Sequence, residues 1–84
     1  MVGVGGLTAD PAIAGALRLR RFYVRPAYRR SGVGRDLVRR LLEHAVGFTR
    51  LVTVNAGTTE AAAFWERTGL VRSTRNGITH ERTI

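Results

Sequence analysis

One stretch of the chain has the residue types and the spacing to bind an anion through its backbone. Residues 22–24 read as the apolar end of a strand, which Pro26 ends because proline has no N–H to donate to a sheet. A basic loop with Gly32 and Gly34 follows, and it leads into a predicted helix over residues 35–46, where apolar residues recur at helical spacing. Such a unit directs backbone N–H groups and the positive end of the helix dipole at one point. The pattern predicts an anion site, most often one for phosphate.

The same residues exclude two other kinds of phosphate loop. There is no third glycine for a dinucleotide fingerprint, and no Gly-Lys-Ser/Thr for a nucleoside triphosphate loop. The remaining pattern, V-x-P-x-x-R-x-x-G-x-G from Val24 to Gly34, closely resembles the coenzyme A pyrophosphate loop of the GNAT N-acetyltransferase superfamily. This resemblance implies that the backbone N–H groups from Arg29 to Gly34 hold the pyrophosphate.

A second motif carries the same resemblance. Residues 61–70, Ala-Ala-Ala-Phe-Trp-Glu-Arg-Thr-Gly-Leu, are similar to a later motif of the family, and a predicted strand lies between the two motifs. The resemblance extends over nearly the whole chain from Val2 onward. It corresponds to the C-terminal part of the family's domain, without the strand, two helices and strand that open it. We therefore expect a single truncated GNAT-like domain over residues 1–84.

The resemblance also implies which residues bind the cofactor, expected to be acetyl-CoA, and that the acceptor is a primary amine. A backbone N–H of the strand before the loop would polarise the thioester carbonyl, and the loop itself would hold the pyrophosphate. Two polar positions after the next strand would complete the site. The predicted cofactor-binding residues are Phe22, Tyr23, Val24, Arg29, Arg30, Ser31, Gly32, Val33, Gly34, Asn55 and Thr58.

No catalytic residue can be assigned in the same way. Amine acetylation needs a base for the ammonium proton and an acid for the departing thiolate. The position of the family's tyrosine acid is Trp65, whose indole N–H donates a hydrogen bond but has no usable pKa. Many relatives carry a glutamate on the strand before the loop, where this chain offers Arg18 and Arg20.

Other polar residues are weaker candidates. We expect Glu66 to face solvent in a surface ion pair, and His44 to lie on the solvated face of the first helix. His80 and Glu81 alternate on the last strand, so one of them could face the groove. Tyr23 flanks the loop and could donate its hydroxyl.

Composition narrows the function classes without choosing among them. The 84 residues carry 14 arginines, no lysine and six acids, for a net charge of +8. Arginine pairs well with phosphate, so this balance fits a polyanionic cofactor, a nucleic acid or an acidic partner, although an arginine-rich composition alone would give the same charge. The lack of cysteine excludes disulfides, and two separated histidines make no metal cluster. With no membrane-length apolar run and no signal peptide, the expected location is the cytoplasm.

Hydrophobic patterning predicts the elements that position the site. We expect an α/β (α+β) fold with a mixed sheet of about five strands and two helices, in the order β-β-α-β-α-β-β. The strands are expected at residues 2–7, 17–24, 51–55, 70–75 and 78–84, and the helices at 35–46 and 60–68. The alternation slips at Arg21 and Phe22, which predicts a bulge; in the resembling family this bulge opens the cofactor slot. Asn76-Gly77 predicts a two-residue hairpin turn.

Three functions stay open: a GNAT-type acetyltransferase, a non-catalytic or vestigial coenzyme A-binding module, and a basic nucleic-acid-binding domain. The last is the least favoured because the few aromatic residues are not interleaved with basic ones. The strand at 2–7 should form a sheet edge without Lys, Glu or Pro to prevent pairing. We therefore expect a homodimer with Val2, Val4 and Leu7 at its interface.

Overall fold

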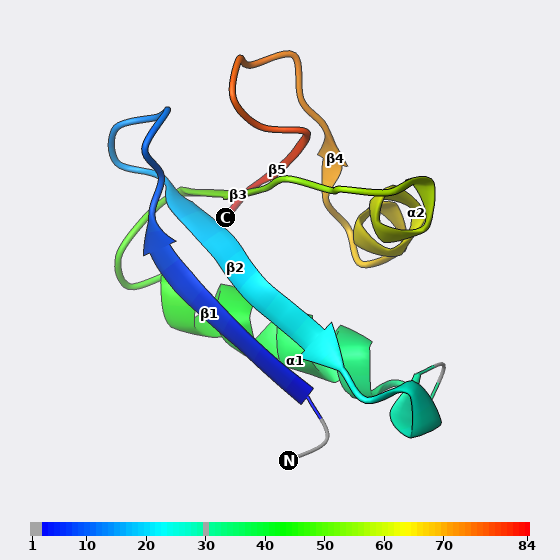
Figure 1. The fold of residues 1–84 in the computed structure, drawn as a ribbon. Coiled ribbons are helices and arrows are strands. Elements are labelled where there is room, and N and C mark those ends of the chain that lie inside the picture. The colour runs from blue at the N-terminus through cyan, green and yellow to red at the C-terminus, as the bar shows by residue number, and fades with distance from the viewer. Residues whose placement is uncertain (1–2, 30) are drawn as a thin grey trace.

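The computed structural model describes residues 3–29 and 31–84. The elements are β1 (Gly3–Ala9), β2 (Leu17–Val24), the 3-10 helix η1 (Pro26–Tyr28), α1 (Val33–Ala45), β3 (Leu51–Val54), α2 (Thr59–Arg67), β4 (Val71–Arg72) and β5 (His80–Thr83). The strands form one sheet in the order β1-β2-β3-β5-β4, and α1 connects β2 to the parallel strand β3 (Figure 1). The predicted mixed sheet, its two helices and the βαβ unit are confirmed.

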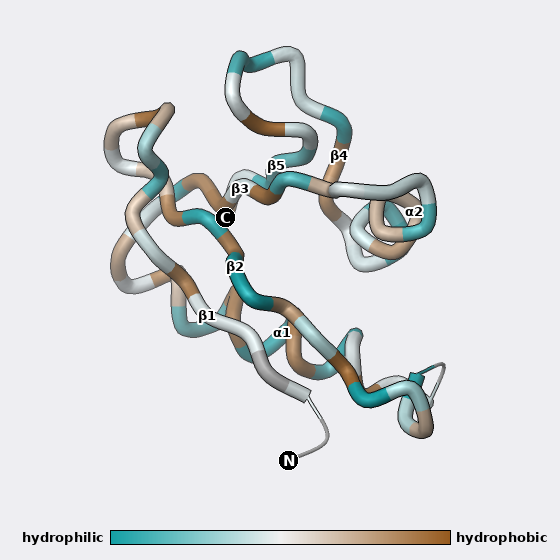
Figure 2. The backbone as a smooth tube through the Cα atoms, viewed as in Figure 1, coloured by the Kyte–Doolittle hydropathy of each residue, from teal (hydrophilic) through white to brown (hydrophobic). Residues whose placement is uncertain are grey.

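The two faces of the sheet differ because polar and apolar residues alternate along the strands (Figure 2). Leu17 and Leu19 of β2 lie on the face that α1 covers, so Arg18 and Arg20 belong to the opposite face. The buried core residues are Leu19, Val38, Ala45, Val52, Val54, Trp65 and Leu70, from both helices and the centre of the sheet. Among the described residues no helix lies on the opposite face.

β2 contains the bulge that the sequence predicts. The pairing advances by two residues on β1, from Val4 to Gly6, and by three on β2, from Tyr23 back to Arg20. Arg21 lies inside the bulge with a φ of +55°. This left-handed conformation costs a residue other than glycine about 1–2 kcal/mol.

Beside the bulge the sheet divides. β2 pairs with β3 only at Leu17–Val52 and Arg18–Thr53. Beyond these pairs β2 runs on with β1, while β3 continues with β5 toward α2 (Figure 1). The split leaves one side of β2 without a strand partner along its second half.

Two predicted helix and strand boundaries need correction at the N-terminal side. α1 begins at Val33 rather than Arg35, because Gly32 takes a φ of +89° and serves as its N-cap. β1 extends past Leu7 to Ala9, while the predicted start at Val2 lies outside the described residues.

The C-terminal hairpin is shorter than predicted, and the two-residue turn at Asn76-Gly77 is wrong. The pairs Val71–Glu81 and Arg72–His80 leave a loop over residues 73–79. Thr79 bonds to both neighbouring strands: its N–H donates to the Val54 carbonyl at 3.1 Å, and its carbonyl accepts from the Ser73 N–H at 2.9 Å. The chain then turns early, because the Ser73 hydroxyl accepts from the Arg75 N–H at 3.0 Å.

Candidate functional site

The start of α1 presents a cluster of backbone N–H groups that have no acceptor among the described residues. In the described part of the chain no oxygen accepts a hydrogen bond from the N–H groups of Gly32, Val33, Gly34 or Arg35. Helix geometry explains this, because the first four N–H groups of a helix have no partner within it. The positive end of the helix dipole adds to their attraction for an anion.

This cradle begins later in the chain than the predicted one. The N–H of Arg29 donates to the Pro26 carbonyl at 3.3 Å, and that of Ser31 to the Tyr28 carbonyl at 3.4 Å, within the turn that η1 forms. Arg30 lies outside the described residues. Of the predicted N–H groups, those of Arg29 and Ser31 therefore have partners within the turn, while those of Gly32, Val33 and Gly34 have none among the described residues.

The side chain of Arg29 holds the loop against the end of β2. Its Nε donates to the Val24 carbonyl at 3.0 Å, and its guanidinium carbon lies 5.5 Å from the centroid of the Tyr23 ring. The Tyr23 ring is 48% exposed beside the loop. Arg29 therefore acts on the shape of the loop.

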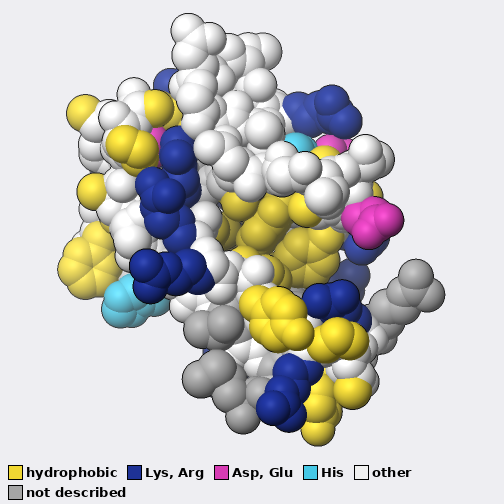
Figure 3. Space-filling model, in the orientation of Figure 1, with side chains coloured by type: hydrophobic (Ala, Val, Ile, Leu, Met, Phe, Trp, Pro, Cys, Tyr) yellow, Lys and Arg dark blue, Asp and Glu magenta, His cyan; other side chains and the backbone are white. Residues whose placement is uncertain are grey.

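An aromatic cluster lies where β2 separates from β3. The Phe22 ring centroid is 5.3 Å from that of Phe64 and 4.9 Å from that of Trp65, and the two α2 rings are 5.1 Å apart. Trp65 is buried, whereas Phe22 and Phe64 are half-buried. Figure 3 shows hydrophobic side chains at the floor of a hollow between β2 and α2.

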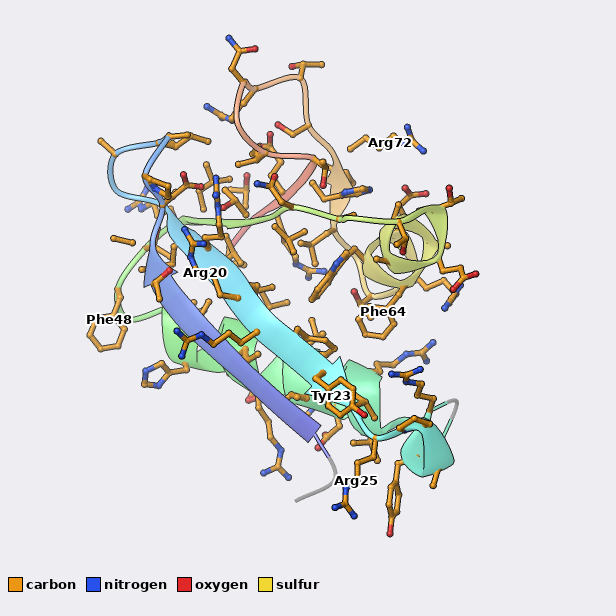
Figure 4. The ribbon with its side chains drawn as sticks, in the orientation of Figure 1. Arg20, Tyr23, Arg25, Phe48, Phe64 and Arg72 are labelled. Atoms are coloured by element: carbon orange, nitrogen blue, oxygen red, sulfur yellow. The ribbon has the colours of Figure 1, made fainter. Side chains whose placement is uncertain are left out.

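Gly34 connects the cradle to this aromatic cluster. A Cβ at Gly34 would lie 3.1 and 3.2 Å from two ring carbons of Phe64, and 3.5 Å from Cγ2 of Val24. Glycine thus lets Phe64 (labelled in Figure 4) close over the first turn of α1. The sequence analysis gave Gly34 a role toward the ligand only, and it missed this packing role.

The two polar candidates after β3 lie at the junction with α2. The Thr58 hydroxyl accepts a hydrogen bond from the Ala61 N–H at 3.0 Å and caps α2. Asn55 is exposed directly after β3. Both residues lie on the side of the split that β3 and α2 form.

A buried carboxylate, Asp10, lies at the apex of the split. Asp10 accepts hydrogen bonds from the Thr53 hydroxyl at 2.5 Å, the N–H groups of Ala12 at 2.7 Å and Ile13 at 3.1 Å, and the Arg18 guanidinium at 3.2 Å. Burial raises the pKa of Asp10, but these hydrogen bonds and the Arg18 charge lower it by more. The net pKa is therefore below its usual value. A carboxylate so fully engaged is no catalytic base.

Arg18 is buried, although its alternation with Leu17 and Leu19 predicts exposure. The loops at residues 10–16 and 73–79 meet over it, and its guanidinium donates to the Gly77 carbonyl at 2.8 Å. Its Nε has no partner among the described atoms. The signal for this cluster was the Asp-Pro turn, where an aspartate commonly binds the N–H groups that follow it.

The other acid–base candidates are also engaged. Glu66 forms the predicted surface ion pair, 3.4 Å from Arg72, and its Oε2 lies 2.9 Å from Nε2 of the buried His80. The hydrogen bond from His80, together with the Arg72 charge, outweighs partial desolvation and lowers the pKa of Glu66. Glu81 pairs with Arg75 at 3.2 Å. The structure adds no catalytic acid or base to the sequence prediction, which assigned none.

Three further observations concern the described residues. His44 is exposed, as predicted, with its ring centroid 5.3 Å from that of Phe48. No described group of three or more His, Cys, Asp or Glu side chains could hold a metal ion. No described helix combines the length and the apolar character that a membrane crossing requires.

Comparison with known proteins was made by sequence and by structure. A family model described as an acetyltransferase (GNAT) domain matches residues 1–71. A search of curated proteins found no match. A structure classed as an acetyltransferase, from Exiguobacterium sp. 255-15, is 22% identical with a TM-score of 0.84; the match covers 98% of this chain and 54% of that one.

Two further structures, both classed as GNAT-family acetyltransferases, agree. The one from Desulfovibrio desulfuricans is 24% identical with a TM-score of 0.80, and the match covers 99% of this chain and 61% of that one. The one from Staphylococcus aureus Mu50 is 16% identical with a TM-score of 0.81, with 99% and 60% covered. The chain therefore spans between one half and two thirds of the length of these structures. Because the family model matches most of its residues, the chain belongs to the GNAT acetyltransferase family.

Proposed function

We propose that the chain binds acetyl-CoA and transfers its acetyl group to a primary amine. The observation that carries this proposal is the separation of β2 from β3 directly beside the N–H cradle of α1. The separation of the strands offers an extended slot, which fits the thioester arm of the cofactor. The N–H cradle offers an anion site, which fits its pyrophosphate. Membership of an acetyltransferase family supports the same reading.

Each part of the site then has a role toward the cofactor, which supplies an acetyl thioester. The N–H groups of residues 32–35 bind the pyrophosphate. The N–H groups that β2 directs away from β1, among Phe22, Tyr23 and Val24, hold the cofactor's arm and polarise the thioester carbonyl. Phe22 and Phe64 exclude water from the slot, while Asn55 and Thr58 border it at the start of α2.

Proton transfer in this proposal involves solvent. The neutral amine nitrogen bonds to the acetyl carbon, the carbon–sulfur bond breaks, and the thiolate leaves with the bonding electrons. Water accepts the ammonium proton and returns one to the thiolate, because the acids near the sheet are already hydrogen-bonded to protein groups. Catalysis then rests on orientation and on polarising the carbonyl.

A specific observation also favours a second function, coenzyme A binding without catalysis. Trp65 occupies the position where the family's tyrosine acid is expected, and it is only 5% exposed within the aromatic cluster. It packs as a core residue and cannot protonate a thiolate. A single-turnover assay for acetyl transfer to a panel of amines, made on protein that binds the cofactor, separates the two functions.

The test of cofactor binding places a negative charge beside the cradle. Ser31→Asp should weaken acetyl-CoA binding in calorimetry at least tenfold, while the carboxylate near the start of α1 keeps the helix stable. Thr74→Asp makes the same charge change in the exposed loop after β4 and should leave the affinity unchanged. Equal affinities for the unaltered chain and Ser31→Asp would contradict the cradle.

Salt dependence tests the nucleic-acid alternative. A cofactor with a few phosphate charges should lose affinity only modestly between 50 and 200 mM salt, whereas an interface with many phosphate contacts loses about 10³–10⁵. A steep loss on duplex DNA, together with no binding of coenzyme A, would favour the nucleic-acid function.

A further inference from the structure

We infer that Arg20 and Arg21, at the bulge of β2, form an anion site that selects acceptor amines carrying a phosphate or carboxylate group. The inference rests on the proposed acetyl transfer and specifies its acceptor. The two residues are called the bulge arginines below.

The first argument is the backbone conformation of Arg21. Its φ of +55° is one that glycine adopts without strain, and β1 opposite carries three glycines, so the sequence here readily uses that residue. The arginine therefore costs free energy that a glycine would not, and residues in such strained conformations cluster at ligand sites. Arg21 is exposed, so packing in the core does not explain an arginine at this position.

The second argument is the absence of an internal counter-charge. All six acids of the chain lie in the described residues, and none is within 4.0 Å of a bulge arginine nitrogen. Arg20 uses only its Nε, which donates to the Thr8 hydroxyl at 2.6 Å. This bond fixes the guanidinium above β1 and leaves its two terminal nitrogens without a partner in the described part of the chain.

The third argument is position. By the strand alternation Arg20 belongs to the face without a helix, and Figure 3 shows arginines gathered along β1 and β2 on that face, beside the hydrophobic floor of the hollow. Arg20 lies in the middle of β2, and Figure 4 shows Tyr23 further along the strand toward its C-terminal end. The cradle lies past that end, so a cofactor held there extends its thioester back toward the bulge.

An acceptor therefore reaches the thioester from the open face, next to the bulge arginines. A guanidinium pairs with phosphate or carboxylate through two parallel hydrogen bonds, which fix the orientation of the bound group as well as its position. An acceptor anchored by its anionic group would present its amine to the acetyl carbon. A neutral amine would lack this anchor.

The experiment uses two pairs of amines that differ in one anionic group: O-phosphoethanolamine with ethanolamine, and β-alanine with propylamine. Calorimetry measures their binding to the full chain saturated with coenzyme A. We expect the anionic member of at least one pair to bind at least tenfold more tightly, and the pair that responds identifies phosphate or carboxylate. Arg21→Gly should remove this preference, keep coenzyme A binding, and keep or raise the melting temperature.

Arg67→Ala, which removes one exposed charge on α2, is the matched control and should keep the preference. Equal affinity within both pairs, or a preference that survives Arg21→Gly, overturns the inference while the proposed function stands. If coenzyme A itself does not bind, the proposed function fails instead. Inorganic phosphate binding, compared between the unaltered chain and Arg21→Gly, then decides whether the anion site exists.

Discussion

The ring of Phe64 decides which residue the first turn of α1 can carry at position 34. In most helices replacing glycine by alanine stabilises the fold by up to about 1 kcal/mol. Here the added methyl would press on a ring that already packs against Phe22 and Trp65. The usual gain and the packing cost therefore oppose each other at Gly34.

We predict that Gly34→Ala lowers the free energy of unfolding in urea, by about 0.5–1 kcal/mol. In a Phe64→Leu background, which removes the ring, the same substitution should become neutral or stabilising. Gly47→Ala is the control, because a Cβ there meets no atom within 4 Å. Additive effects of the Gly34 and Phe64 substitutions would show that the two positions do not interact.

Asp10 is the residue whose ionisation matters most to the fold. Its side chain has 0% exposure, and it links the β1–β2 loop to Thr53 of β3. Since its folded pKa is lowered, its contribution to stability is present above the usual value of 3.8 and is lost as the pH falls through the folded pKa.

Asp10→Asn should lower the free energy of unfolding at pH 7 by about 3 kcal/mol, because Arg18 is left buried without its carboxylate. Below pH 3.8 the difference from the unaltered chain should shrink. Asp36→Asn, at an exposed acid whose pKa is also lowered, chiefly by its hydrogen bond from Arg39, should have a much smaller effect. Denaturant unfolding across this pH range gives the comparison, and a constant difference would contradict the assignment to Asp10.

The glycine loop and the helix start were predictable because their signal lies in neighbouring residues. The Asp10–Arg18–Thr53 cluster was not, since it depends on loops that are far apart in sequence. The alternation along β2 would leave Arg18 exposed, and it is buried because the loops that carry Asp10 and Gly77 cover it, Gly77 being 59 residues away. The N–H groups of Arg29 and Ser31 differ from the prediction for a local reason. Both donate to carbonyls of η1, although the motif assigned them to the ligand.

Among the elements, α2 is joined to the sheet at its C-terminal end by Glu66, which contacts both Arg72 of β4 and His80 of β5. Glu66 reaches Nε2 of His80 on β5, and His80 is 2% exposed. Local patterning predicted α2, whereas the long hairpin after it was wrong because the chain turns at Ser73, whose hydroxyl accepts from the Arg75 N–H.

Glu66→Ala should destabilise the chain, because an unpaired nitrogen on buried His80 costs about 1–3 kcal/mol. Glu66→Gln, which can still hydrogen-bond to the ring, should retain most of the stability. Glu60→Ala removes an acid at the other end of the same helix and serves as the control. Thermal unfolding distinguishes the three variants. Equal midpoints for Glu66→Ala and Glu60→Ala would show that the contact between Glu66 and His80 does not stabilise the fold.

Across the whole molecule, the chain is compact although it spans only part of the length of the structures it resembles. Its radius of gyration is 12.1 Å, close to the value of about 12 Å expected for a domain of 84 residues. β1 is an edge strand, as predicted. Leu7, one of the residues expected at a dimer interface, is partly buried and packs against the core.

The homodimer stays a prediction, with edge-to-edge pairing of β1 as its basis. Light scattering of the unaltered chain at micromolar concentration should give the mass of a dimer. Gly6→Lys should give a monomer, because a lysine on the edge opposes pairing and a Cβ at Gly6 meets only the Arg20 carbonyl, at 3.9 Å. A monomer mass for the unaltered chain would refute this assembly.

The short pairing between β2 and β3 also affects how the chain unfolds locally. Only two residue pairs connect the ribbon of β1 and β2 to the rest of the sheet. Amide hydrogen exchange should therefore resolve two cooperative units, β1–β2–α1 and β3–β5–β4–α2, that open with different free energies. A ligand lying in the slot would contact both units at once. Its binding would then slow exchange in both and make them open as one.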